Sequence, residues 1–184
     1  MPVADVARAA EVSEATVFNY FPTKEDLVFQ GMEAFEADLL QAVRDRPAGE
    51  SAAAAFGRFV TEARGVLAAE DEQTAAHLLG VTRMIANSPA LQVRQREIFA
   101  QYTASLAALL AEETGAPPNS VEPAVAAGAL LGAHRALIEY VRRRTLAGDS
   151  AAAIGRGVRA EAKMAFALLG AGLGEYARRP GAGT

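Results

Sequence analysis

The chain has 184 residues, a net charge of −4 at pH 7 and no cysteine. Without cysteine there can be no disulfide, thiolate metal site or cysteine nucleophile, and the negative charge is unlike that of proteins that bind nucleic acid through a general positive field. Helix formers dominate and no long stretch alternates apolar and polar residues, so the sequence predicts an all-α protein.

Three helices are predicted before the first clear break in the chain. An alanine-rich helix covers residues 3–10, and Ser13 is a typical N-cap for a second helix that runs to about Tyr20. Pro22 ends that helix, and a capping-box arrangement predicts a third helix over about 24–45. Two short helices joined by a tight turn are the geometry that places a second helix in the DNA major groove.

A loop separates this segment from the rest of the chain. Pro47 and Gly49 end the third helix within R-P-A-G-E-S at 46–51, so we place a boundary between an N-terminal domain of residues 1–46 and a C-terminal domain of residues 47–184. The helices predicted in the C-terminal domain cover about 52–69, 73–87, 90–113, 121–147 and 150–177. We expect the tail at 178–184 to be disordered.

The start of the chain and its most apolar window bear on localisation. Met1 is followed by Pro-Val-Ala-Asp, not by a basic segment and an apolar run, so no signal peptide is visible. The window 124–138 is too short, and too interrupted by His134 and Arg135, to span a bilayer. We therefore expect a cytoplasmic protein without membrane association.

The string A-D-V-A-R-A-A-E-V-S-E-A-T-V-F-N-Y-F-P-T-K-E-D-L-V resembles the tetracycline-repressor (TetR) family of bacterial transcriptional regulators. The resemblance is close over residues 3–28, and beyond them only helix number and order support it. It implies a helix-turn-helix domain followed by a helical ligand-binding and dimerisation domain. The family commonly has tyrosine where this chain has Phe18. The family also has a basic arm and a helix before the motif, so we expect the first helix of the domain to be missing.

The resemblance implies which residues contact DNA. The residues expected to face DNA are Ser13, Thr16, Asn19 and Tyr20 on the recognition helix and Lys24 at the start of the next helix. Thr16, Asn19 and Tyr20 lie three and four apart and so share one helix face. Hydroxyls and lysine suit phosphate, and asparagine can read an adenine edge. Val12, Val17 and Phe21 would be core residues.

The resemblance further implies that the last two helices pair with those of a second copy in a four-helix dimer interface. The predicted interface residues are Gly128, Leu131, Gly132, Ile154, Val158, Ala162, Ala165 and Leu169. A two-fold dimer would place two recognition helices one DNA turn, about 34 Å, apart. Packing within the chain is the alternative role for the same residues.

The helices of the C-terminal domain would also line an effector pocket. The candidate lining residues are Phe59, His77, Val81, Arg83, Met84, Phe99, Gln101 and Tyr102. Their apolar character suggests a hydrophobic small molecule, although core packing is the alternative for most of them. His77 and the expected interface residue His134 are too far apart in sequence, and too unaccompanied, to indicate a metal site, and we expect no cofactor.

The motifs narrow the function. No G-x-S-x-G, H-E-x-x-H or phosphate-loop pattern appears in the sequence, so we expect no enzyme. We expect a ligand-responsive homodimeric transcriptional regulator, most often a repressor in this family, that binds a palindromic operator in double-stranded DNA. The alternative is a dimeric small-molecule-binding helical protein that has lost DNA binding because the first helix is absent.

Overall fold

The structure is a computed structural model that describes residues 2–62, 72–173 and 176–178. These residues form helices and no strand, which confirms the all-α prediction. The helices are α1 (Val3–Ala9), α2 (Glu14–Tyr20), α3 (Met32–Arg44), α4 (Ala52–Glu62), α5 (Glu72–Ala86), α6 (Pro89–Thr114), α7 (Glu122–Leu146) and α8 (Ala151–Leu173).

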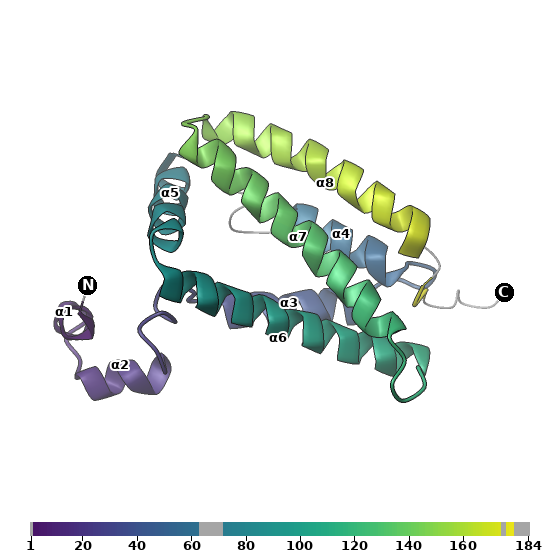
Figure 1. Cartoon of the computed structure of the whole chain (residues 1–184), viewed down its shortest axis with the longest axis horizontal. Coiled ribbons are helices and arrows are strands. Elements are labelled where there is room, and N and C mark those ends of the chain that lie inside the picture. The colour runs from purple at the N-terminus through teal and green to yellow at the C-terminus, as the bar shows by residue number, and fades with distance from the viewer. Residues whose placement is uncertain (1, 63–71, 174–175, 179–184) are drawn as a thin grey trace.

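The helices divide into a small N-terminal pair and a larger body (Figure 1). α1 contacts α2, and Figure 1 shows the pair at one end of the molecule, away from the other helices. In the body, α7 packs against α6 on one side and α8 on the other, while α3 contacts both α4 and α6. We call α1 and α2 the α1–α2 unit, and α3 to α8 the body.

The body holds nearly all of the buried apolar side chains. Its largest fully buried side chains are Leu39, Val43, Phe56, Val60, Leu106, Leu110, Leu130 and Val158. Each such side chain contributes about 1.5–3 kcal/mol by leaving water. The α1–α2 unit, by contrast, buries Ala7 and Val17, so the stability of the fold resides mainly in the body.

α7 is the central helix of the body. It is long and apolar enough, by length and composition alone, to cross a membrane, and it passes this test alone among the helices of the described ranges. A core helix of a globular protein passes the same test, and α7 buries leucines on the faces turned to its neighbours. Packing within the chain therefore accounts for part of its apolar composition.

α6 shows how sequence signals set the helix ends. The Ser88 hydroxyl accepts a hydrogen bond from the Leu91 N–H at 3.3 Å, and Pro89 occupies the first turn, where its missing N–H costs nothing. Gly115 ends the helix with a φ of 60°, a left-handed conformation that glycine adopts without strain.

The third helix begins later than the sequence predicts, at Met32 instead of Lys24. The expected cap at Thr23 does form, since its N–H donates to the Asp26 carboxylate at 2.9 Å, but turns follow it. The same carboxylate accepts a 2.7 Å bond from Arg94 on α6, and Gly31 takes a φ of 85°. Anchoring to α6 and the left-handed glycine interrupt a helix that local propensity favours.

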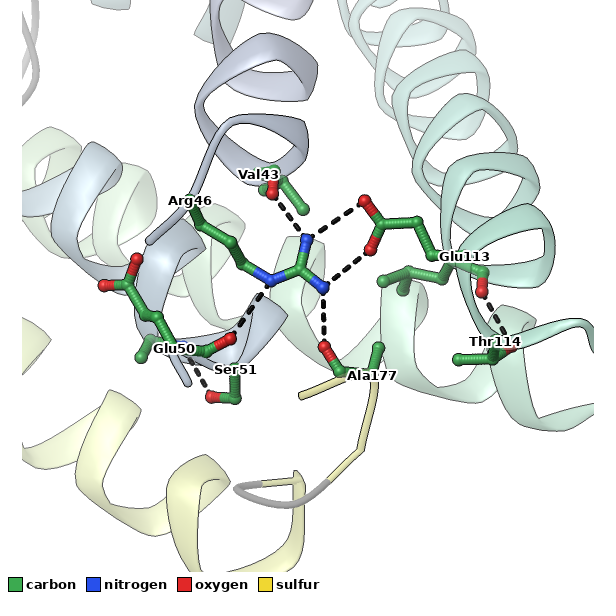
Figure 2. Close-up of polar contacts among 9 residues, drawn as sticks. Val43, Arg46, Glu50, Ser51, Glu113, Thr114 and Ala177 are labelled. Atoms are coloured by element: carbon green, nitrogen blue, oxygen red, sulfur yellow. Dashed lines mark hydrogen bonds and ion pairs between the residues drawn. The ribbon is translucent and has the colours of Figure 1, made fainter. Parts of the chain in front are cut away.

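The predicted linker at 46–51 holds a buried arginine that joins three parts of the body (Figure 2). Arg46 is 3% exposed, donates to the Val43 and Ala177 carbonyls at 2.6 Å, and forms an ion pair of 2.6 Å with Glu113 at the end of α6. Its Nε also donates to the Glu50 carbonyl at 3.2 Å. The segment is thus held to the rest of the body by Arg46. The domain boundary at residue 46 stays a prediction.

The start of the tail is attached to the same region. Arg178 donates from Nε to the Gly49 carbonyl at 2.9 Å and pairs with Ser51 in an isolated antiparallel bridge. The expected disorder of the tail is therefore wrong for Arg178, because backbone partners are within its reach. Residues 179–184 lie outside the described part of the chain.

Candidate DNA-binding surface, effector pocket and dimer face

The turn between α1 and α2 has a defined geometry. The Val12 N–H donates to the Ala7 carbonyl at 3.0 Å and the Glu11 N–H to the Arg8 carbonyl at 3.2 Å, the pattern of a Schellman motif. This motif requires a left-handed residue, and Glu11 occupies that position with a φ of 56°. Because glutamate adopts this conformation at a cost, the turn that orients α2 is strained.

α2 presents most of the predicted DNA-facing side chains to solvent. Ser13 caps the helix by accepting the Thr16 N–H at 3.0 Å, and the two hydroxyls lie 2.8 Å apart. Asn19 is exposed and Tyr20 is 77% exposed, whereas Thr16 is half-buried. The exposed polar groups on one face of a capped helix can reach phosphates and base edges in a groove.

The predicted core of this unit is correct only in part. Val17 is buried and Phe21 is half-buried, but Val12 is 42% exposed. Val12 directly follows the left-handed Glu11, so the chain direction changes there and the side chain leaves the interior.

Lys24 does not lie at a helix start as predicted. It falls within the turns that precede α3, with its side chain mostly exposed and its Nζ 3.9 Å from a carboxylate oxygen of Glu25. Its ammonium can still approach a phosphate, but without the support of a helix N-terminus.

The predicted effector residues separate into buried and exposed groups. Phe99 and Tyr102 are buried, Phe59 and Val81 are half-buried, and Gln101 is exposed with its amide 3.1 Å from Glu36. The His77 side chain lies outside the described residues.

Two of the predicted pocket residues on α5 face solvent. Arg83 is exposed and Met84 is 51% exposed, whereas the next residue, Ile85, is buried. Successive side chains on a helix point about 100° apart, so the inward position of Ile85 turns its neighbours outward. The prediction that Arg83 and Met84 line an internal pocket is therefore not supported by their positions.

His134 is a core residue and not, as predicted, an interface residue. Its ring stacks on Phe35 with centroids 5.4 Å apart and lies edge-on to Phe56 and Phe99. Burial lowers the pKa of His134 to about 4, so the imidazole is neutral at pH 7. Its Nδ1 has no hydrogen-bond partner among the described residues. The sequence pattern did not reveal this aromatic cluster, because its rings come from helices far apart in the chain.

Two pockets bear on ligand binding. One, of about 470 Å³, lies between α4 and α8, where Gly57 faces Phe166, and Arg58 and Lys163 are among the residues that line it. The other, of about 370 Å³, is lined by Tyr20 of α2, the turns after it, and residues of α3 and α6, among them Glu36, Gln101 and Tyr102. We call the second one the joint pocket.

The predicted dimer face is partly buried within the chain. Within the chain α7 packs on α6 and α8, and α8 packs on α7 and α4. Leu131, Ile154, Val158 and Ala162 are buried in this packing. These residues therefore have the alternative role, intrachain packing. The other predicted residues, Gly128, Gly132, Ala165 and Leu169, are exposed or half-buried.

The same region of the chain also carries exposed apolar side chains. Val121, which directly precedes α7, Val125 on α7, and Met164 and Leu168 on α8 are each more than half exposed. A Cβ placed on Gly128 would meet no atom within 4 Å beyond the adjacent backbone of its own helix, so the surface around it is unfilled. The dimer interface itself stays a prediction.

No group of three or more His, Asp or Glu side chains within the described ranges could hold a metal ion.

Comparisons with known proteins match both halves of the chain. Residues 1–30 match the family model described as bacterial regulatory proteins, tetR family, and residues 50–173 match one described as MftR C-terminal domain. A 25-residue stretch is 76% identical to the HTH-type transcriptional regulator LuxR of Vibrio harveyi. This match covers 14% of the chain and 12% of the length of that relative.

Proposed function

The chain belongs to the tetR family of bacterial regulatory proteins, and we propose that, within this family of transcriptional regulators, it acts as a ligand-responsive repressor that binds a palindromic operator as a homodimer. The observation that carries this proposal is the capped helix α2, which presents Asn19 and Tyr20 to solvent on one face. Asn19 would contact a base edge, and Tyr20, Ser13 and Lys24 would contact phosphates.

Dimerisation would use the open face of α7 and α8 around Val121, Val125, Met164 and Leu168. Exposed apolar side chains on two adjacent helices, with an unfilled surface at Gly128, suit the same face of a second copy related by a two-fold axis. A dimer would place two α2 helices in successive major grooves.

An effector bound in the body would alter the separation of the two α2 helices. A coupling free energy of about 1–3 kcal/mol between the ligand and DNA sites would suffice for regulation. Phe59, Val81, Phe99 and Tyr102 remain candidates for contact with a hydrophobic effector. Members of this family are regulators, not enzymes, so we propose no catalytic activity, and we place the protein in the cytoplasm with its operator.

A DNA titration tests the proposal. Fluorescence anisotropy with duplex DNA from upstream of the coding sequence should show saturable binding that weakens as salt rises. Asn19→Ala should weaken specific binding by about tenfold or more, whereas Glu112→Gln, an exposed change on α6, should not. Equal binding by wild type and Asn19→Ala would exclude α2 as the reading helix.

Sedimentation velocity tests the dimer separately. Leu168→Glu introduces a charge on the open face at a side chain that is 76% exposed, so it should yield monomer without loss of fold. Val93→Glu is the matched control, since Val93 is an exposed apolar residue on α6. A dimer that persists in Leu168→Glu would contradict the proposed face.

One observation favours the second function, small-molecule binding without DNA binding. In the first 30 residues, two basic side chains, Arg8 and Lys24, accompany five acidic ones, and Arg8 is paired with Asp5 at 3.0 Å. A gel shift on this chain, and on one extended at its N-terminus, separates the two functions. Binding by the extended chain alone would support the second function for this sequence.

A further inference from the structure

The joint pocket combines a buried carboxylate with aromatic walls. Its volume of about 370 Å³ lies within the range of small-molecule sites, about 300–1,000 Å³. We propose that the joint pocket binds a small arylalkyl ammonium ion, with the Glu36 carboxylate as its anchor.

Glu36 is the residue that selects a cation. It lies on α3 and is 8% exposed, yet no Lys, Arg or His nitrogen of the described residues lies within 4.0 Å of its carboxylate. Its hydrogen-bond partner is the neutral Gln101 amide, at 3.1 Å from Oε2. A buried carboxylate is costly without a counter-charge, and a bound ammonium would supply both charge and hydrogen-bond donors.

The other charges of the joint pocket neutralise each other. Arg94 forms an ion pair of 2.7 Å with Asp26. Although burial opposes it, hydrogen bonds from Thr23 and Arg94 hold the pKa of Asp26 below its usual value, so Asp26 stays ionised against Arg94. Glu36 is then left as the uncompensated charge among the lining residues, and a carboxylate or phosphate ligand would be repelled by it.

The walls of the joint pocket suit the organic part of such a ligand. Tyr20, Phe21 and Phe29 contribute aromatic rings, and Ile98 contributes an aliphatic side chain. Aromatic faces attract ammonium groups and also pack against an aryl ring. The Tyr102 hydroxyl donates to the Met32 carbonyl, so it holds α6 to the start of α3 beside the site.

The position of the joint pocket gives the ligand a regulatory consequence, which rests on the proposed function. Tyr20 belongs to α2, whereas Gln101 belongs to α6 in the body. A ligand in contact with both would fix the position of the recognition helix relative to the body, and so change DNA affinity.

Isothermal titration calorimetry on the full chain tests the site with phenethylamine as the probe. Phenethylamine should bind, while its neutral counterpart phenethyl alcohol and its carboxylate counterpart hydrocinnamate should bind at least about tenfold more weakly. Because this series uses the wild-type chain, it does not depend on the folding of any variant. Equal binding of the amine and the alcohol, or no binding of the amine at millimolar concentration, would overturn the proposal.

Glu36→Gln provides the residue-level test. It preserves the shape of the side chain and removes its charge, so phenethylamine affinity should fall at least about tenfold. Glu112→Gln is the matched control, because Glu112 is exposed on α6 outside the joint pocket, and should bind the amine like wild type. Unchanged affinity in Glu36→Gln would show that the amine binds elsewhere.

DNA anisotropy with and without phenethylamine separates this site from the proposed function. Glu36-dependent amine binding by a chain that does not bind DNA would refute the proposed function and leave the site intact. DNA binding without Glu36-dependent amine binding would refute the amine site and leave the proposed function intact.

Discussion

The α1–α2 unit and the body differ in helix length and in how many apolar side chains they bury. α1 and α2 have seven residues each and bury Ala7 and Val17, whereas α6 and α7 have 26 and 25 residues and bury many large side chains. Short helices with little buried surface are marginal by themselves. The polar side chains proposed to meet DNA therefore lie on the least stable part of the molecule, which the body must hold in place.

A substitution of Phe56 tests which region supplies the stability of the fold. Phe56 is fully buried, so Phe56→Ala should lower the free energy of unfolding by about 3–5 kcal/mol through lost burial and the cavity left behind. Phe18→Ala, on the exposed side of α2, should cost under about 1 kcal/mol. Urea unfolding followed by circular dichroism measures both. Similar losses of unfolding free energy in the two variants would mean that the body is not the main source of stability.

Arg46 tests whether the segment between α3 and α4 belongs to the body. Arg46→Met leaves Glu113 and the carbonyls of Val43 and Ala177 without their donor, and should cost about 3 kcal/mol. The control is Arg58→Met, which breaks the more exposed pair with Glu50 and should cost about 0–1 kcal/mol. Urea unfolding distinguishes them, and equal costs would mean that Arg46 is not an anchor.

His134 makes the stability of the body depend on pH. The pKa of His134 is about 4 in the folded chain and about 6.5 in the unfolded chain. The stability of the fold is therefore complete above pH 6.5 with respect to this group. It falls as the pH drops towards 4, because the unfolded chain takes up the proton first. The loss reaches about 3 kcal/mol, since one pKa unit corresponds to about 1.4 kcal/mol. His134→Phe should remove this slope while the acidic groups still titrate. Parallel pH profiles for the two proteins would contradict a buried neutral histidine.

A substitution of Glu11 should change the stability of the α1–α2 unit only slightly. Glu11→Gly relieves the left-handed backbone at a φ of 56° and should stabilise this unit by about 0.5–1 kcal/mol. Amide hydrogen exchange should show slower exchange in α1 and α2, with exchange in α7 unchanged. Faster exchange in α2 would indicate that glutamate at position 11 makes contacts that glycine cannot replace.

Local signals predicted much of the fold and of the α2 surface. Ser13 caps α2 as predicted, because an oxygen near a helix start needs only its own neighbours. The start of α3 was missed because Arg94, 68 positions away in sequence, draws Asp26 towards α6. No local pattern contains that pairing.

The dimer face and the aromatic cluster illustrate a second limit of the sequence. Ile154 and Val158 recur on one helix face, but periodicity does not tell whether α7 of the same chain or a second copy covers that face. Likewise, the burial of His134 and of Glu36 depends on helices that pack from distant parts of the sequence. These assignments require the tertiary structure.

We propose that DNA recognition resides on α2, whereas the stability of the fold resides in the body. Tyr20→Ala tests both parts at once, through operator affinity by anisotropy and unfolding free energy by urea titration. We predict at least about tenfold weaker operator binding with an unfolding free energy within about 0.5 kcal/mol of wild type, because Tyr20 is 77% exposed. Unchanged operator affinity in a folded Tyr20→Ala protein would show that this face of α2 does not contact the operator.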